Sequence, residues 1–359
     1  MNPVCLGCFL AAVALSADAD RLFYPGSLTV LPEDGRGIYF EAFDAARREI
    51  RIEICVLEDP LVLQNLKRAI DRGVRVRVIV DNGKYEALAA ERDNLATYLT
   101  GPGAELHLSN PIFPRSFPKV ILVDERYALI GSACLDSTTF AQYRDYAYVT
   151  DVAGIVDDLS RLFENDWRHS ASPGQSFPTY NPTPAVRHPD VIVSPVNSTS
   201  RLVSLIQKAR RTLDVTSELL GNPTLESELA AAAVRGVRVR LIAPEIVNGA
   251  TPSGQELQAR SLRALSAAGL QIHVTRLPEG PQSPYMHART AVADGKSAYL
   301  GSISLSADST TLNREVGLML DNTHLVEKLR NQFEIDFSSK SQPYGVTAKR
   351  RSRGKPAGR

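Results

Sequence analysis

The hydrophobic residues of this chain fall into short apolar runs that alternate with segments of helical period. Residues 50–57 are rich in isoleucine, valine and leucine and predict a strand, and residues 61–72 carry apolar side chains at helical spacing. Gly73 follows that helix and is a usual helix terminator, after which residues 74–80 predict a second strand. Strands that alternate with helices in this way are typical of an α/β fold whose sheets are covered on both faces.

The next part of the chain continues the pattern with a hairpin. Residues 120–123 and 127–130 are apolar runs separated by the polar turn 124–126, which predicts two antiparallel strands. A further strand is expected over 146–150. The segment 155–163 places its apolar residues on one stripe and predicts an amphipathic helix.

This whole pattern occurs twice. The hexapeptide Arg-Gly-Val-Arg-Val-Arg at 72–77 recurs at 235–240, a shift of 163 positions (235 − 72). Further along the shift becomes 170 (301 − 131), as Gly131-Ser132 recurs as Gly301-Ser302. Constant offsets over so many positions indicate an internal duplication, with seven extra residues in the second copy.

We therefore divide the chain into two domains of similar size, which suits its 359 residues. The first domain spans 21–169 and the second 191–338. The residues between them, 170–190, are rich in Pro, Ser and Thr without a periodic pattern, which is typical of a linker. Residues 1–20 and 339–359 are left as terminal segments.

Both terminal segments differ from the rest in composition. Residues 1–17 are apolar and end in small side chains, so that 1–20 resembles a secretory signal peptide, although no Lys or Arg precedes the apolar run. A misassigned start codon and a buried N-terminal helix are the alternatives. Residues 349–359 hold six Lys and Arg, and we expect 339–359 to be a disordered basic tail that either solubilises the chain or is attracted to anionic lipid or nucleic acid.

Charge and cysteine content narrow the function only slightly. The formal net charge is +1, and without the six tail cations it is −5 (1 − 6), which does not favour a nucleic-acid groove. Cys55 and Cys134 lie in apolar runs, where we expect buried thiols. No Cys pair stands at zinc spacing from a His, so the sequence gives no support for a metal site.

The late part of the second copy carries the candidate chemistry. On an extended strand His287 and Arg289 point to the same side, because side chains two positions apart share a face. An imidazole beside a fixed cation suits a phosphodiester, since the nitrogen can attack phosphorus while the cation holds the non-bridging oxygens. Ser302 is placed to add a donor to those oxygens. Glu315 is placed to accept from the other ring nitrogen of His287 and fix its tautomer.

These residues resemble the signature of the phospholipase D superfamily, His-x-Lys-x4-Asp followed by a Gly-Ser turn, with the match His287-x-Arg289-x4-Asp294 and Gly301-Ser302. The resemblance covers roughly residues 30–338 and implies two tandem αβα-sandwich domains related by a pseudo-twofold axis, with the site where they meet. Family members use one histidine from each copy, of which one forms a phosphohistidine and the other protonates the leaving oxygen, without metal or cofactor. The resemblance implies catalytic roles for His287, Arg289, Lys119 and Glu315, and substrate binding by Ser132, Ser302, Asp145 and Asn313. Asp124 and Asp294 begin the hairpin turns, where aspartate is favoured by the backbone, and we expect them to be mainly structural.

The first copy departs from this signature at its first position. Phe117 stands in place of the histidine, while Lys119 and Asp124 remain. Phenylalanine can neither attack phosphorus nor carry a proton, and general acid–base help is typically worth ~10²–10⁴ in rate. We therefore expect reduced activity. In the second copy, Arg289 replaces the family lysine and keeps its charge.

From the sequence we expect a phospholipase D-like phosphodiesterase, hydrolase or transphosphatidylase, that cleaves a phospholipid headgroup ester through His287. Such a protein would be an exported lipid-remodelling or virulence-type factor with peripheral membrane contact. The alternatives are a catalytically impaired pseudoenzyme that binds anionic lipid or another phosphodiester, and a nuclease. We expect it to be secreted or periplasmic, or cytoplasmic if the N-terminal segment is not a signal, and to be a monomer with an internal pseudo-dimer.

Overall fold

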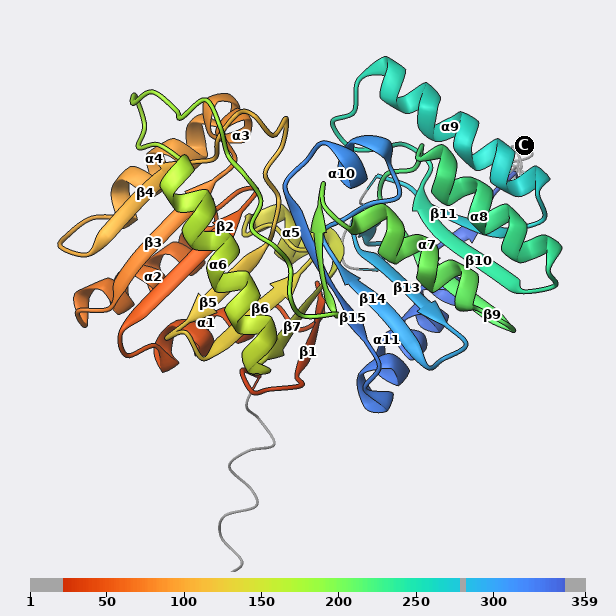
Figure 1. Cartoon of the computed structure of the whole chain (residues 1–359), viewed down its shortest axis with the longest axis horizontal. Coiled ribbons are helices and arrows are strands. Elements are labelled where there is room, and N and C mark those ends of the chain that lie inside the picture. Colours follow the sequence, from red (N-terminus) through yellow and green to blue (C-terminus); the bar gives the residue numbers. More distant parts are fainter. Residues whose placement is uncertain (1–21, 278–281, 346–359) are drawn as a thin grey trace, which may run out of the picture.

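The computed structural model of the chain describes residues 22–277 and 282–345, which form two α/β halves lying against each other (Figure 1). The elements of the first half are β1 (Leu28–Leu31), α1 (Gly37–Ala45), β2 (Glu49–Ile54), α2 (Pro60–Asp71), β3 (Arg75–Val80), α3 (Asn82–Ala87), α4 (Ala89–Tyr98), β4 (Ala104–Leu108), β5 (Val120–Val123), β6 (Tyr127–Gly131), α5 (Ser137–Gln142), β7 (Tyr143–Thr150) and α6 (Ala153–His169).

The second half repeats this order. Its elements are β8 (Val191–Ser194), α7 (Ser198–Lys208), β9 (Thr212–Thr216), α8 (Pro223–Val234), β10 (Arg238–Pro244), α9 (Pro252–Ala267), β11 (Gln271–Thr275), β12 (Tyr285–Met286), β13 (Arg289–Ala293), β14 (Ser297–Gly301), α10 (Ala307–Thr311), β15 (Glu315–Leu320), α11 (Thr323–Ile335), the π-helical turn η1 (Asp336–Lys340) and β16 (Gln342–Pro343).

The two sheets have the same topology. The first has the strand order β1-β7-β6-β5-β2-β3-β4, and the second has β8-β15-β14-β13-β9-β10-β11, with β16 added at its edge. The pairing register repeats as well: Ile50 lies opposite Val123 in the first sheet, as Leu213 lies opposite Ala293 in the second. These offsets are 163 and 170, so the predicted duplication and the predicted tandem α/β fold are confirmed.

The signals that define the helices are duplicated too. Asp59 caps α2 by accepting from the backbone N–H of its first turn, Pro60 occupies the first helical position, and Gly73 ends the turn beyond it at φ 89°. Asn222 caps α8 in the same way, again before a proline. Glycine is favoured at such positive φ because it has no β-carbon, which explains why Gly73 follows α2 and Gly236 follows α8.

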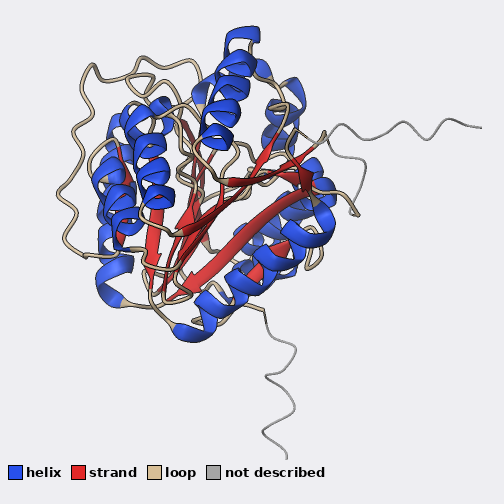
Figure 2. Cartoon of the chain, turned by 90° about the vertical axis from the view of Figure 1, so that its right-hand side faces the viewer, coloured by secondary structure: helices blue, strands red, loops and turns tan. Residues whose placement is uncertain are grey.

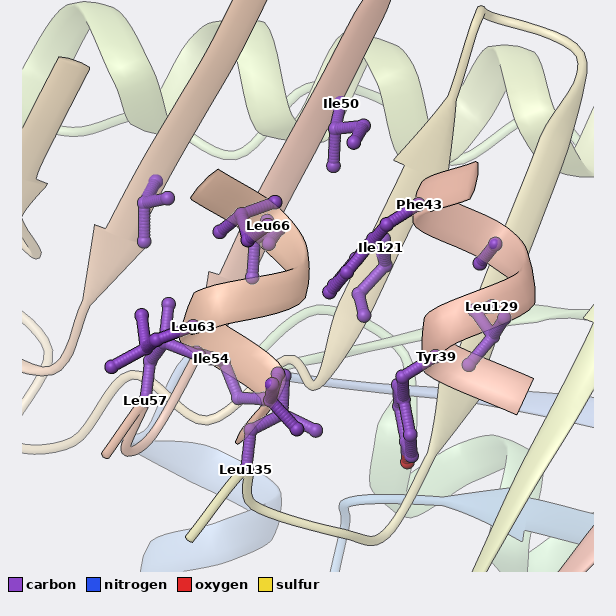
Figure 3. Close-up of a cluster of buried hydrophobic side chains, with 14 of the residues drawn as sticks. Tyr39, Phe43, Ile50, Ile54, Leu57, Leu63, Leu66, Ile121, Leu129 and Leu135 are labelled. Atoms are coloured by element: carbon purple, nitrogen blue, oxygen red, sulfur yellow. The ribbon is translucent and has the colours of Figure 1, made fainter. Parts of the chain in front are cut away.

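Helices cover both faces of each sheet, and the view in Figure 2 shows the strands enclosed between them. In the first half, α1 and α2 press Phe43 and Leu66 onto Ile50 and Ile121 of the sheet (Figure 3). On the opposite face, α6 and α11 contribute to one hydrophobic cluster that also includes residues of both sheets, such as Ile130 and Leu300. The two halves therefore share a core, and burial of this apolar surface holds them together.

The halves also exchange short strand segments. Tyr285 and Met286 of the second half pair in parallel with Tyr143 and Arg144 of the first. Ser116 of the first half pairs in parallel with Arg314 of the second. Met286 is the counterpart of Ser116 and Arg314 is the counterpart of Arg144, each 170 residues further on, so the second pairing repeats the first with the halves exchanged. Each segment leads directly into a signature motif, so each motif is carried to the opposite half.

Two buried ion pairs cross the same boundary. The guanidinium of Arg144 lies 2.8 Å from Asp336, and that of Arg314 lies 3.0 Å from Asp166. Both arginines are fully buried. The arginines differ by 170 positions and so do the aspartates, so one interaction is used twice with the two halves in exchanged roles.

The structure departs from the sequence expectations at two places. Cys55 and Cys134 form a disulfide, with their Cα atoms 5.9 Å apart, and are not free thiols. The reason is that Leu57 bridges Leu135, which brings the ends of the two strand runs together. In addition, the predicted tail begins in ordered structure, because β16 pairs with β11.

Irregular chain connects α6, which ends at His169, to β8, which begins at Val191. The predicted signal peptide lies outside the described residues, as does the basic stretch 346–359 of the tail. Among the described residues, no helix has the length and apolar character needed to cross a membrane.

Candidate functional site

A cavity of about 510 Å³ opens where the two halves meet. Its lining comes from both halves and includes the first residues of both signature motifs. The lining residues are Cys55, Val56, Glu58, Lys84, Leu88, Arg115, Phe117, Lys119, Cys134, Asp136, Thr138, Thr139, Tyr143, Glu218, Leu219, Val247, Asn248, Gly249, Ala250, His287 and Arg289.

His287 is held in this cavity by a carboxylate from the other half. Its Nδ1 lies 2.8 Å from Oδ2 of Asp145, which is fully buried. Asp145 follows Arg144, and the backbone carbonyl of Arg144 accepts from the N–H of His287, so strand exchange brings the two side chains together. With Nδ1 donating to Asp145, Nε2 is the nitrogen that carries the free lone pair.

The charge states suit a nucleophilic imidazole. Burial and the adjacent Arg289 hold the pKa of His287 well below its usual range, which leaves the ring neutral near pH 7. Burial raises the pKa of Asp145 to about 6, against the opposing effect of Lys119 and Arg289, so Asp145 is largely ionised at that pH.

Two cations meet beside the ring. Nζ of Lys119 donates to the backbone carbonyl of Ser132 at 2.5 Å, and Nη1 of Arg289 approaches the same oxygen at 3.3 Å. Burial, together with the charge of Arg289, lowers the pKa of Lys119 to about 7. An anion bound between these groups would favour the charged form of Lys119, because it would offset the repulsion from Arg289.

Glu218 lies on the other side of the imidazole. Its Oε2 is 3.6 Å from Nε2 of His287 and accepts from the guanidinium of Arg289, while its Oε1 accepts from the hydroxyl of Tyr285 at 3.2 Å. Burial raises the pKa of this carboxyl, but His287, Arg289 and Lys119 outweigh that effect and hold it below its usual value. His287 therefore lies between two carboxylates.

The first half gives the cavity an apolar wall. Phe117 lines it together with Val56 and the disulfide of Cys55 and Cys134. Tyr143 of the same half reaches toward the second half: its ring lies 5.3 Å from that of His287, and its hydroxyl accepts from the side-chain amide of Asn248 at 2.6 Å. The arrangement offers a nucleophile and two cations next to apolar surface.

The sequence predicted Glu315 as the hydrogen-bond partner of His287, and this prediction is wrong. Glu315 accepts from Ser309 and Asn313 of its own half and not from His287. The reason is the strand exchange, because the carboxylate of each half faces the motif of the other. By the same register Glu315 belongs with position 117, where phenylalanine offers no partner. Burial raises the pKa of Glu315 to about 7.

The structure does not bring the other predicted substrate ligands to the cavity. Ser132 donates to Asp145 and is fully buried, while the hydroxyl of Ser302 is bonded to the backbone of Val316. Asn313 donates to Glu315. These side chains support the site from behind, since each is bonded within the protein.

Asp124 and Asp294 organise the hairpin turns. Each carboxylate accepts from three successive backbone N–H groups of the segment before a central strand, those of 47–49 and of 210–212. These bonds hold the pKa of both carboxyls below their usual value despite the effect of burial.

Sequence reasoning missed Glu218, Tyr143 and Tyr285. Glu218 stands two residues after β9, and the only signal for it was a comparison of the copies, in which it is the counterpart of Cys55 (218 − 163). The tyrosines lie on the exchanged strands, whose pairing partner is in the other half. A pattern within one copy does not reveal such contacts.

The family model described as "Cardiolipin synthase, PLD-like domain" matches residues 39–167 and again 202–337. A cardiolipin synthase of Geobacillus kaustophilus is 24% identical over 337 residues, covering 83% of this chain and 63% of that protein. Cardiolipin synthase B of Salmonella typhi is 26% identical, covering 86% of this chain and 80% of that protein.

Among solved structures, phosphatidylserine synthase of Haemophilus influenzae superimposes with a TM-score of 0.68 at 13% identity, over 88% of this chain and 87% of that one. This similarity concerns the fold. The family match covers both halves in register with the duplication, and each half has the topology that the repeat predicts. The chain therefore belongs to the cardiolipin synthase family of phospholipase D-like proteins.

Proposed function

We propose that this protein is a phosphodiesterase of the phospholipase D type, in which Nε2 of His287 attacks the phosphorus of a phospholipid and forms a phosphohistidine. The observation that carries the proposal is the bond between Nδ1 of His287 and Asp145, which makes Nε2 the unprotonated nitrogen of the ring, in a cavity that also holds Arg289 and Lys119. A neutral imidazole beside two cations combines a nucleophile with stabilisation of the charge that develops on phosphate oxygens.

Phospholipid as the substrate is supported by the relatives, which are named cardiolipin synthases. The apolar wall around Phe117 provides surface for the apolar part of such a molecule. Because the chain spans about 63% of the length of the Geobacillus protein, we carry over the class of substrate and no particular headgroup. If an alcohol attacked the phosphohistidine in place of water, the phosphatidyl group would be transferred to that alcohol and the reaction would be a transfer instead of a hydrolysis.

Trapping the intermediate tests this proposal. Incubation with dioleoyl phosphatidylglycerol vesicles followed by rapid quenching should release glycerol and give a phosphopeptide in which His287 carries the dioleoyl phosphatidyl group, detected by its mass in mass spectrometry. His287→Ala should abolish both the phosphopeptide and headgroup release, while Glu334→Gln at a distant surface should leave both intact. Vesicle binding without any phosphopeptide would overturn the proposed enzymatic activity and favour a pseudoenzyme. The pseudoenzyme alternative is supported by the replacement of the first-copy histidine by Phe117.

The disulfide supports export as the second part of the proposal. Cross-links such as Cys55–Cys134 persist in oxidising compartments and are rare in the reducing cytosol. If the protein is exported, material isolated from cells under acid quench should resist thiol alkylation at both cysteines until it is reduced. Full alkylation without reduction would contradict export.

A further inference from the structure

Comparison of the two copies shows that three functional positions of the site differ between them. His287 corresponds to Phe117 (287 − 170), and Glu218 corresponds to Cys55 (218 − 163). Ser304 corresponds to Cys134 (304 − 170). In one copy these positions hold an imidazole, a carboxylate and a hydroxyl, and in the other they hold a phenyl ring and a disulfide.

The consequence is visible around the cation of each motif. In the second copy, Arg289 spans the space between Glu218 and Ser304, and Nε of Arg289 donates to Ser304 at 3.1 Å. In the first copy the equivalent positions are bonded covalently to each other, and Lys119 turns to the carbonyl of Ser132. Among the described residues, the proton-carrying side chains that contact Nε2 are Glu218 and Arg289, and both come from the second copy.

We infer that Glu218 is a catalytic residue which replaces the missing first-copy histidine as the proton donor and acceptor of the reaction. The inference rests on the proposed phosphodiesterase activity. Glu218 lines the cavity, and its Oε2 lies 3.6 Å from the nitrogen that attacks. It is held there from two directions, by the hydroxyl of Tyr285 and by Arg289.

The two half-reactions balance with one proton on this carboxyl. In the first, the lone pair of Nε2 bonds to phosphorus, the bond to the leaving oxygen breaks, and the Glu218 carboxyl gives its proton to that oxygen. In the second, the oxygen of water bonds to phosphorus, the phosphorus–nitrogen bond breaks with its electrons returning to Nε2, and the proton of water passes to the Glu218 carboxylate. The group is thereby ready for the next turnover.

Binding of the substrate supplies the protonated form. In the free site Arg289 donates to Glu218 and favours the carboxylate. A phosphodiester that takes over the donors of Arg289 leaves the carboxyl beside a second negative charge, which favours proton uptake. Binding of the phosphodiester is thereby linked to protonation of Glu218.

Glu218→Gln separates the two half-reactions when substrates with different leaving groups are compared. Dioleoyl phosphatidylglycerol has an alkoxide leaving group that needs a proton, and we expect its turnover to fall by ~10²–10⁴. Bis(p-nitrophenyl) phosphate needs no acid in the first step. Here we expect a burst of p-nitrophenol of about one equivalent per enzyme, followed by slow release, because attack of water on the phosphohistidine lacks its base.

Controls distinguish this role from a structural one. Glu334→Gln also removes a carboxylate paired with an arginine, Arg240, but in a different surface pocket, and should behave as wild type. Glu218→Asp keeps a carboxyl and should retain more turnover than Glu218→Gln, and thermal unfolding of each variant checks that it folds.

The outcomes are distinct. Equal loss on both substrates without a burst would overturn the inference, since it would assign Glu218 to positioning Arg289 only. Near-wild-type turnover of phosphatidylglycerol by Glu218→Gln would overturn it as well. If wild-type protein forms no phosphohistidine with either substrate, the proposed function fails and the inference falls with it.

Discussion

At the scale of single residues, the site shows how position 117 affects groups around it. Glu315 is buried, its carboxylate accepts from Ser309 and Asn313, and burial raises its pKa to about 7. Its counterpart Asp145 holds an imidazole. The difference between them follows from the phenylalanine at 117, because the backbone of that residue is bonded to Arg314 just as His287 is bonded to Arg144.

We therefore predict that Phe117→His gains activity. The new imidazole should face Glu315 as His287 faces Asp145, and provide a second proton carrier in the cavity. Turnover of phosphatidylglycerol should rise at least about tenfold, toward the ~10²–10⁴ that such a group is typically worth. The same substitution should rescue Glu218→Gln.

Phe117→Leu serves as its control, since it changes the size of the side chain without adding a proton carrier. Steady-state turnover of phosphatidylglycerol is compared for Phe117→His, Phe117→Leu, Glu218→Gln and the double variant Phe117→His, Glu218→Gln. A folded Phe117→His protein with neither gain nor rescue would show that position 117 does not reach the reacting atoms.

At the scale of elements, buried carboxylates stabilise the loops around the site. Glu91 of α4 is fully buried, and its Oε1 accepts from the backbone N–H of Leu57 at 2.7 Å. Burial raises its pKa to about 7 from a usual value of about 4.5. The folded protein thus binds a proton at this group that the unfolded chain releases between those two pH values.

This linkage predicts how stability depends on pH. The stabilisation is fully present below about pH 4.5 and is lost as the pH rises through about 7, because the ionised carboxylate is disfavoured in the folded state. Glu91→Gln keeps an acceptor for Leu57 and has no charge to bury. We expect its Tm to exceed that of wild type at pH 8, and the difference to vanish near pH 4.5.

Differential scanning fluorimetry across that range measures the effect. Glu86→Gln on the exposed side of α3 should follow the wild-type curve. Parallel curves for Glu91→Gln and wild type would mean that Glu91 does not take up a proton on folding.

The elements were the part of the molecule that sequence predicted well. The runs 50–57 and 74–80 became β2 and β3, and the stripe from 155 became α6, because hydrophobic period and helix caps are local signals. The pairing of Asp145 with His287 was missed, since it depends on an exchange of strands between halves. The disulfide was missed for a similar reason: Cys55 and Cys134 are 79 positions apart, and each was interpreted within its own run.

At the scale of the whole molecule, two buried ion pairs, Arg144–Asp336 and Arg314–Asp166, connect the halves. Arg314 is fully buried against Asp166 and also lies over the ring of Phe113 at 4.1 Å. Removing one partner of a buried pair leaves an uncompensated charge, which typically costs about 3–5 kcal/mol. We therefore expect Arg314→Leu to lower the free energy of unfolding by about that amount.

Urea denaturation followed by circular dichroism measures this change. The control is Lys67→Ala, which breaks an exposed pair with Asp71 on α2 and should cost no more than about 1 kcal/mol. An Arg314→Leu protein as stable as the control would mean that the crossed pair does not hold the halves together.

The exchange of Arg144 and Arg314 between the halves has a consequence for biosynthesis. When the first half has left the ribosome, Arg144 has no Asp336 to bind, and Asp145 has no His287 to orient. Chains grow from the N-terminus at ~5–20 residues per second, so this half waits on the order of ten seconds for its partners. A nascent chain therefore lacks the pair of Asp145 and His287 until the second half has emerged, and the cavity between the halves assembles only after both halves have been made.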